Sequence, residues 1–344
     1  MESQLPLLGL MLGDCTGIGP EQSAKVLASG SMREAARLLV VGDRRVLELG
    51  ARDAGVQLDI RVVKRPEDAD WKSAAVQMVD LANIDPAALK RGAISAESGR
   101  VTGETLKYMI ELALAGRLDG ITFAPLNKAA LHAGGWKYND EHIMFARLTS
   151  HQGYHGEMNV LDNKWMSRAT SHVSLREALD QLTPARIDEA LDLAHETMKG
   201  AGFANPRIAV AALNPHGGEN GLFGREEIEI IAPAVARGAA RGIACKGPFP
   251  ADTVFIKGFG DEFDGVLTMY HDQGQIATKL KGFNRGVTVS GGLKTVFTTP
   301  AHGTAFDIVG QGVASTGAFE NALRLGARLA LARKAESEAQ ATHA

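Results

Sequence analysis

The apolar positions along the chain change their spacing repeatedly. Compact apolar runs, typical of buried strands, cover residues 5–12, 36–43, 58–64 and 265–270. Apolar residues at helical spacing predict helices over residues 44–55, over the first part of 103–127, and over 314–336. Strands and helices that alternate in this way predict an α/β protein, a parallel sheet with helices on both faces.

Length and composition narrow the class of protein. A chain of 344 residues fits two domains or one large α/β domain. The net charge of -3 gives no reason to expect a nucleic acid or an anionic membrane as partner. The apolar start runs into Asp14 without a basic region, so we expect a first strand and not a signal peptide. Two distant cysteines, Cys15 and Cys245, exclude a disulfide framework and favour a cytoplasmic protein.

One strand ends in groups that suggest chemistry. The apolar run Gly265–Tyr270 leads directly into His271, Asp272, Gln273 and Gly274. Strands usually end at Gly, Pro, Asn or Ser, so an imidazole and a carboxylate at this point need a reason. In open α/β sheets, ligands bind outside the carboxyl ends of the strands. We therefore treat this segment as part of a candidate active site.

Two more histidines share this setting. His216 follows a strand, and His172 precedes a helix whose start is marked by the capping box Ser174 to Glu177. Three imidazoles from separate segments, His172, His216 and His271, can hold one divalent ion and leave positions open for substrate oxygens. The spacing alone does not distinguish this metal site from three unrelated histidines.

Two glycine-rich loops are candidate cofactor sites. The segment over residues 13–21 lacks the Lys-Ser/Thr of a P-loop and the full G-x-G-x-x-G spacing, so a tight turn explains it equally well. The segment "HGTAFDIVGQG" resembles the adenosine-binding loop of isopropylmalate and isocitrate dehydrogenases. An aspartate can accept hydrogen bonds from both ribose hydroxyls and repels a 2′-phosphate. We expect NAD, in preference to NADP, at His302, Gly303, Thr304 and Asp307.

Five segments together resemble the 4-hydroxythreonine-4-phosphate dehydrogenase family, and the resemblance extends over nearly the whole chain. They are "GDCTGIGPE", "APLNKAALHAGG", "NPHGGENGLFG", "YHDQGQIATKLKGF" and "HGTAFDIVGQG". The resemblance implies a two-domain α/β fold like that of isocitrate dehydrogenase, with α/β/α layers and an interdomain cleft. It implies a homodimer with shared active sites, and zinc, magnesium, manganese or cobalt held by His172, His216 and His271. It also implies NAD(P)-linked oxidation of a secondary alcohol of a small molecule, with decarboxylation.

On this basis we expect a discontinuous cofactor-binding domain over residues 1–125 and 290–335. Residues 126–289 would form the domain for substrate, metal and dimerisation.

The departures from the family bear on the substrate. The resemblance places His142 and Lys279 at substrate-binding positions, but Thr288 and Phe297 stand where the family has a phosphate-binding Asn and Arg. Loss of an Arg removes a charge-assisted pair with phosphate, and a Phe would make the pocket wall apolar. We therefore favour a cis-dihydrodiol carboxylate of the terephthalate type or another non-phosphorylated hydroxy acid. The alternatives are 4-hydroxythreonine 4-phosphate and an acid-sugar phosphate such as threonate or erythronate 4-phosphate.

The roles of two site residues stay open at this point. Asp272 is the base, the orienter of a metal-bound water, or the partner that fixes the tautomer of His271. Lys279 is expected to polarise a substrate carboxylate. Two other classes of protein use similar features: a metal-dependent hydrolase or lyase without cofactor, and a periplasmic-type binding protein. A hydrolase has no use for Asp307 in its loop, and a binding protein has no use for titratable groups at strand ends.

Overall fold

The computed structural model describes residues 5–282 and 285–342 and divides into two compact units. The first comprises Met1–His151 with Leu293–Ala344, and the second is Gln152–Gly292. The second unit is thus one continuous piece of chain inserted into the first. The two-domain α/β fold expected from the resemblance is confirmed. The first unit, however, continues beyond the boundary that we placed at residue 125.

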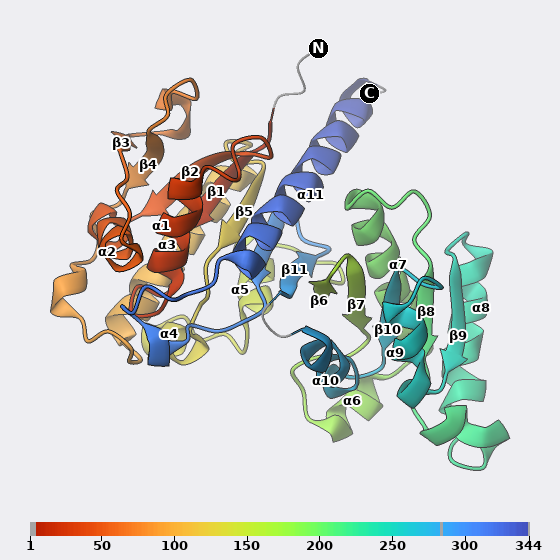
Figure 1. The fold of residues 1–344 in the computed structure, drawn as a ribbon. Coiled ribbons are helices and arrows are strands. Elements are labelled where there is room, and N and C mark those ends of the chain that lie inside the picture. The colour runs from red at the N-terminus through yellow and green to blue at the C-terminus, as the bar shows by residue number, and fades with distance from the viewer. Residues whose placement is uncertain (1–4, 283–284, 343–344) are drawn as a thin grey trace. The chain divides into compact units, whose positions relative to one another are not determined.

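The strands described in the first unit form a parallel sheet in the order β3-β4-β2-β1-β5-β12 (Figure 1). Their bounds are β1 (Leu7–Met11), β2 (Arg37–Gly42), β3 (Ile60–Val63), β4 (Val76–Asp80), β5 (Gly120–Phe123) and β12 (Val296–Pro300). Side chains alternate between two cores: Leu8 and Leu10 lie in one, Met11 in the other. Both faces are therefore buried, as the continuous apolar runs predicted.

Helices cover both faces of this sheet. They are α1 (Gly19–Ser29), α2 (Arg44–Ala54), α3 (Ala96–Leu114), α4 (Lys128–Ala133), α5 (Glu141–Leu148) and α11 (Gly317–Thr342). The long helix α11, blue in Figure 1, packs along β12, β5 and β1. Its residues Phe319 and Leu323 are fully buried in the same core as Leu8.

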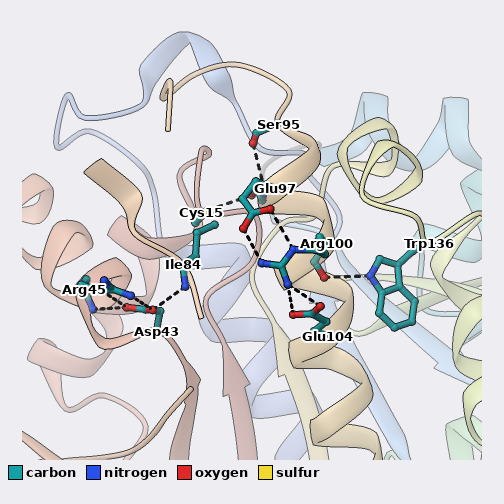
Figure 2. A network of polar contacts seen from close by, with 10 residues as sticks. Cys15, Asp43, Arg45, Ile84, Ser95, Glu97, Arg100, Glu104 and Trp136 are labelled. Carbon is teal, nitrogen blue, oxygen red and sulfur yellow. Dashed lines mark hydrogen bonds and ion pairs between the residues drawn. The ribbon is translucent and has the colours of Figure 1, made fainter. Parts of the chain in front are cut away.

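The contacts of α3 explain why the first unit continues past residue 125 (Figure 2). Ser95 caps the helix, and Arg100 forms ion pairs at 2.6 Å with both Glu97 and Glu104. These pairs are exposed and each stabilises the helix by about 0.5 kcal/mol or less. The carbonyl oxygen of Arg100 accepts a hydrogen bond of 3.1 Å from the indole Nε1 of Trp136. That bond attaches the segment after α4 to the first unit.

The second unit has a mixed sheet in the order β11-β6-β7-β10-β8-β9. Its strands are β6 (Gly156–Leu161), β7 (Lys164–Arg168), β8 (Ile208–Ala211), β9 (Cys245–Phe249), β10 (Gly265–Thr268) and β11 (Val287–Gly291). Strand β6 is antiparallel to both β7 and β11, whereas β7, β10, β8 and β9 are parallel, so the parallel sheet that we expected is interrupted here by one strand. Asp162 and Asn163, at φ 49° and 64°, form the two-residue turn that joins β6 to β7 as a hairpin.

The helices of the second unit are α6 (Leu175–Gln181), α7 (Pro184–Gly200), α8 (Ala232–Ala240), α9 (Ala251–Phe259) and α10 (His271–Gly282). Strand β10 ends at Thr268, and α10 begins only three residues later. The titratable segment singled out above therefore forms the first turn of a helix at the carboxyl end of a strand. Within the described residues, the chain contains no helix with the length and apolar character to cross a membrane.

Candidate active site

Two of the three predicted metal-binding histidines lie side by side in the second unit. Strands β7 and β10 are parallel neighbours, with Arg168 opposite Thr268. Backbone hydrogen bonds continue the pairing past both strand ends, from Thr170 N to the carbonyl oxygen of Met269 at 3.2 Å. The two strands therefore deliver His172 and His271 to the same edge, where their ring centroids are 5.3 Å apart.

These histidines line a small open cavity of about 180 Å³. Its other walls come from the segment before α6, from α6 itself and from the start of α10, with Ser171, Tyr270 and Asp272 among the lining residues. His172 has φ 52°, a left-handed backbone conformation that is uncommon for a residue with a side chain. A residue held in such a conformation often marks a functional position.

Each imidazole contacts a carboxylate through one ring nitrogen. Nδ1 of His271 is 2.7 Å from Oδ1 of Asp272, and Nε2 of His172 is 3.8 Å from Oε2 of Glu157. Burial lowers the pKa of His271 below its usual value, although the bond to Asp272 acts in the opposite direction. A neutral imidazole with one nitrogen directed to a carboxylate is the form that ligates a metal through the other nitrogen. The pair thus fits a divalent ion.

The third histidine of the predicted set, His216, is placed differently. It lies in the loop after β8, where residues 216–220 all have positive φ. The base of this loop is fixed by buried Glu227, which accepts the backbone N–H groups of Leu213 and Asn214 at 2.8 and 2.7 Å. His216 itself is exposed. Among the described residues no three His, Cys, Asp or Glu side chains are grouped closely enough to hold a metal. The three-histidine site stays a prediction.

Gln273 connects the start of α10, which carries His271, to the end of β8, which precedes the loop of His216. Its amide oxygen accepts from the backbone N–H of Met269 at 2.8 Å, and its amide nitrogen donates to the carbonyl oxygen of Ala212 at 2.8 Å. The ends of β10 and β8 are thereby joined through one side chain. Sequence reasoning noted Gln273 but assigned it no role, because a single amide side chain carries no distinctive pattern.

A buried polar network lies next to the histidine pair, and sequence reasoning missed it. Arg168 contacts Asn159 and lies 3.3 Å from Glu157. Asn159 also lies 2.7 Å from the side-chain amide of Gln275 and donates to the hydroxyl of Thr288 at 3.0 Å. Thr288, a predicted substrate contact, is therefore buried and engaged within the unit. Asn159 and Arg168 lie in β6 and β7, whose polar residues hid both strands from pattern analysis.

The two other predicted groups of this unit are exposed. Lys279 lies on α10, two turns after His271, and its side chain is open to solvent. Asp272, at the start of α10, is 73% exposed. Arg285, which we considered as an additional phosphate-binding cation, pairs with Asp162 at 3.0 Å.

The predicted cofactor loop lies in the first unit and packs against the glycine loop before α1. The carbonyl oxygen of Thr304 accepts from the backbone N–H of Ile18 at 3.1 Å, and a Cβ on Gly17 would come within 2.8 Å of the Thr304 side chain. His302 contacts Gln22 at 3.2 Å, and burial lowers the pKa of its imidazole. Close packing of the segment over residues 13–21 therefore explains why position 17 is a glycine, without a bound cofactor.

The end of the loop leaves a carboxylate available. Gly303 and Asp307 are exposed. Asp307 lies two residues after Ala305, which has a positive φ of 43° and begins the turn. The backbone carbonyl of Asp307 accepts from Gln311 at 2.8 Å, which fixes the turn. An exposed carboxylate on a braced turn fits the hydroxyls of a ribose.

Phe297 and His142 are both buried in the first unit. Phe297 is 0% exposed and stacks on Phe145 with ring centroids 4.2 Å apart. His142 is 5% exposed, with its ring 6.4 Å from the same Phe145. The apolar pocket wall that we expected from Phe297 is therefore not formed by its side chain, which belongs to the core.

The model of the family described as pyridoxal phosphate biosynthetic protein PdxA matches residues 34–326. The chain belongs to the PdxA family. It is 46% identical over 327 residues to a putative 4-hydroxythreonine-4-phosphate dehydrogenase 2 of Pseudomonas aeruginosa, covering 94% of this chain and 97% of that one. It is 41% identical to a D-threonate 4-phosphate dehydrogenase of Cupriavidus necator, with 97% and 100% covered. The predicted oxidoreductase activity is confirmed, and this PdxA-family member is a dehydrogenase acting on a small molecule.

Solved structures agree with this assignment. A 4-hydroxythreonine-4-phosphate dehydrogenase from Klebsiella pneumoniae superposes with a TM-score of 0.83 at 36% identity, covering 96% of this chain and all of that one. A terephthalate 1,2-cis-dihydrodiol dehydrogenase from Burkholderia xenovorans superposes with a TM-score of 0.66 at 28% identity, covering 94% and 98%. The dihydrodiol enzyme is thus the more distant of the two, and the preference for a dihydrodiol substrate is not supported.

Proposed function

We propose that this PdxA-family dehydrogenase is NAD-linked and metal-dependent and oxidises the secondary alcohol of a phosphorylated acid. The candidates are threonate 4-phosphate and 4-hydroxythreonine 4-phosphate, with loss of CO2 from the β-keto acid formed. The observation that carries the proposal is the pair His172 and His271, whose rings are 5.3 Å apart at a cavity and each face a carboxylate.

In this proposal His172 and His271 hold the ion, and His216 on its exposed loop is the third ligand. When bound, the ion supplies Lewis acidity to the substrate hydroxyl and NAD+ accepts the hydride. Asp272, hydrogen-bonded to Nδ1 of His271, keeps that imidazole in the tautomer that leaves Nε2 for ligation. Lys279 provides an exposed cation for an anionic group of the substrate.

The substrate part of the proposal rests on two grounds. The relatives at 46% and 41% identity, matched over nearly their whole length, are named for phosphate esters. The residue that argued for a ring substrate, Phe297, is buried in the core and stacked on Phe145. Removing that argument leaves the phosphorylated acids as the better-supported class.

A homodimer is the second part of the proposal. The second unit exposes large apolar side chains one helical turn apart on α6, at Leu175 and Leu179, and on α10, at Ile276 and Leu280. Leu280 is 85% exposed. Apolar side chains gathered on short helices are typical of a surface that is covered in an assembly. We infer that a second copy of the chain covers them.

The deciding experiment measures NADH formation with Mg2+, Mn2+, Zn2+ or Co2+ on D-threonate 4-phosphate, 4-hydroxythreonine 4-phosphate and terephthalate dihydrodiol. We expect kcat/KM to be at least tenfold higher for one of the phosphate esters, and we expect His271→Ala to abolish turnover. A dihydrodiol preferred over both esters would refute the substrate class. Full activity after complete chelation of divalent ions would refute the metal requirement.

A further inference from the structure

Glu157 stands between a buried cation and one of the paired histidines. Its Oε1 is 3.3 Å from Nη2 of Arg168, and its Oε2 is 3.8 Å from Nε2 of His172. The side chains of Glu157 and Arg168 are only 12% and 4% exposed. One carboxylate therefore links the interior of the second unit to the histidine pair.

The position of Glu157 is set from several elements at once. Oε1 of Glu157 also accepts from the amide of Asn159 at 3.2 Å, and that amide donates to Thr288 on β11. Gln275 on α10 reaches the same Asn159 at 2.7 Å. Strands β6, β7 and β11 and helix α10 thus meet in one hydrogen-bonded group, and a carboxylate held in this way has little freedom to turn.

A buried Arg without a matched anion would be costly, since ions lose their hydration in the interior. A carboxylate that neutralises Arg168 needs only one of its oxygens near the guanidinium, and its other oxygen need not face an imidazole. Glu157 has that second feature, and His172 is held in a left-handed backbone conformation at φ 52°. The arrangement does more than balance one charge, because it also directs a carboxylate oxygen towards the ring of His172.

We propose that Glu157 is a positioning residue for the metal site, which holds the ring of His172 through Nε2 so that Nδ1 faces the ion. Arg168 and Asn159 fix the direction of that carboxylate. The inference rests on the proposed function in so far as the bound group is a divalent ion. Carboxylates that contact the far nitrogen of a ligating histidine orient the ring and raise its basicity, and their loss typically lowers metal affinity 10- to 100-fold.

The test is a titration of the metal-free protein with Co2+, in which binding is measured by calorimetry and by the visible absorption of the bound ion. Variants are Glu157→Gln, His172→Ala and the double variant. The matched control is Asp162→Asn, which removes another carboxylate of this unit that pairs with an arginine, here Arg285 at 3.0 Å. Urea unfolding of each metal-free variant separates loss of affinity from loss of fold.

We expect Glu157→Gln to weaken Co2+ binding by roughly ten- to a hundred-fold and to shift the absorption bands. The control should bind as the wild type does. In the His172→Ala background, Glu157→Gln should cause no further loss, because the effect acts through that ring. If Glu157→Gln does not fold, Glu157→Asp retains the charge and withdraws it from His172 by one methylene, with the same expected loss.

Two results would overturn the inference while leaving the proposed function intact. One is wild-type Co2+ affinity in a folded Glu157→Gln or Glu157→Asp protein. The other is an equal further loss when Glu157→Gln is added to His172→Ala. If the wild-type protein binds no Co2+, Mn2+, Mg2+ or Zn2+ at all, the metal-dependent function falls as well.

Discussion

Replacing Phe297 has an effect that can be worked out from its surroundings. The ring is 0% exposed and stacks on Phe145 at 4.2 Å with an interplanar angle of 7°. Truncating a buried Phe to Ala costs about 3–5 kcal/mol, which already includes the cavity that is left. Loss of the aromatic pair accounts for about 0.5–1.5 kcal/mol beyond the buried area. We expect Phe297→Ala to lower the free energy of unfolding by about 4 kcal/mol.

Phe297→Arg should be more damaging still. A guanidinium placed in this apolar core cluster loses its hydration, a penalty of several kcal/mol in addition to the lost packing. Domains of ordinary size are stable by only about 5–15 kcal/mol in total. We therefore expect Phe297→Arg to accumulate as unfolded or aggregated protein and not to gain activity on a phosphate ester.

The assay is urea unfolding followed by tryptophan fluorescence, since Trp71 and Trp136 pack against the same core cluster. Leu114→Ala is the control, because that side chain lies in the same unit but is 47% exposed. Its effect should stay below about 1 kcal/mol. A folded Phe297→Arg protein with wild-type stability and raised kcat/KM on a phosphate ester would show that position 297 lines the substrate pocket after all.

Three further changes test other parts of the structure. Asp307→Ala should narrow the preference for NAD+ over NADP+, measured as the ratio of kcat/KM, because the exposed carboxylate no longer repels a 2′-phosphate; equal use of both cofactors by the wild type would contradict this role. Because burial lowers the pKa of His302 in the folded protein, the unfolded chain takes up the proton at a higher pH than the folded protein does, so the free energy of unfolding should fall as the pH drops below about 6.5. His302→Gln should reduce this dependence on pH, measured by urea unfolding at several pH values. Leu280→Asp should shift the mass measured by light scattering towards the monomer, whereas a wild type that is already monomeric would remove the basis for the shared surface.

The sequence was informative where buried residues follow a simple period. The apolar runs of β1, β2 and β10 were recognised. The strand-end argument singled out His172, His216 and His271, and the structure places His172 and His271 side by side. Strand β7, with the sequence KWMSR, could not be found in this way. Its Lys and Arg suggest an exposed segment, whereas Arg168 is buried and neutralised by a carboxylate from a neighbouring strand.

The roles of Glu157 and Phe297 depend on tertiary contacts that have no local signal. Glu157 acquires its partners from β7 and from the segment before α6, so no spacing in the sequence relates them. Phe297 was assigned to a pocket wall because the family has a phosphate-binding Arg at that position. The packed unit buries the face of β12 that carries Phe297 against α5, and this packing places Phe297 in the core and not in a pocket wall.

The insertion of residues 152–292 into the first unit has a consequence for synthesis on the ribosome. The inserted unit is complete as soon as its own residues have emerged, so it can fold while the chain is still growing. The first unit cannot, since β5 pairs with β12 and its core includes Phe319 and Leu323 from α11. Until β12 and α11 are made, the edge of β5 is unpaired and the part of the sheet that α11 covers stays exposed. That period is when the nascent chain is most exposed to strand-to-strand aggregation, and when a chaperone that shields sheet edges would help most.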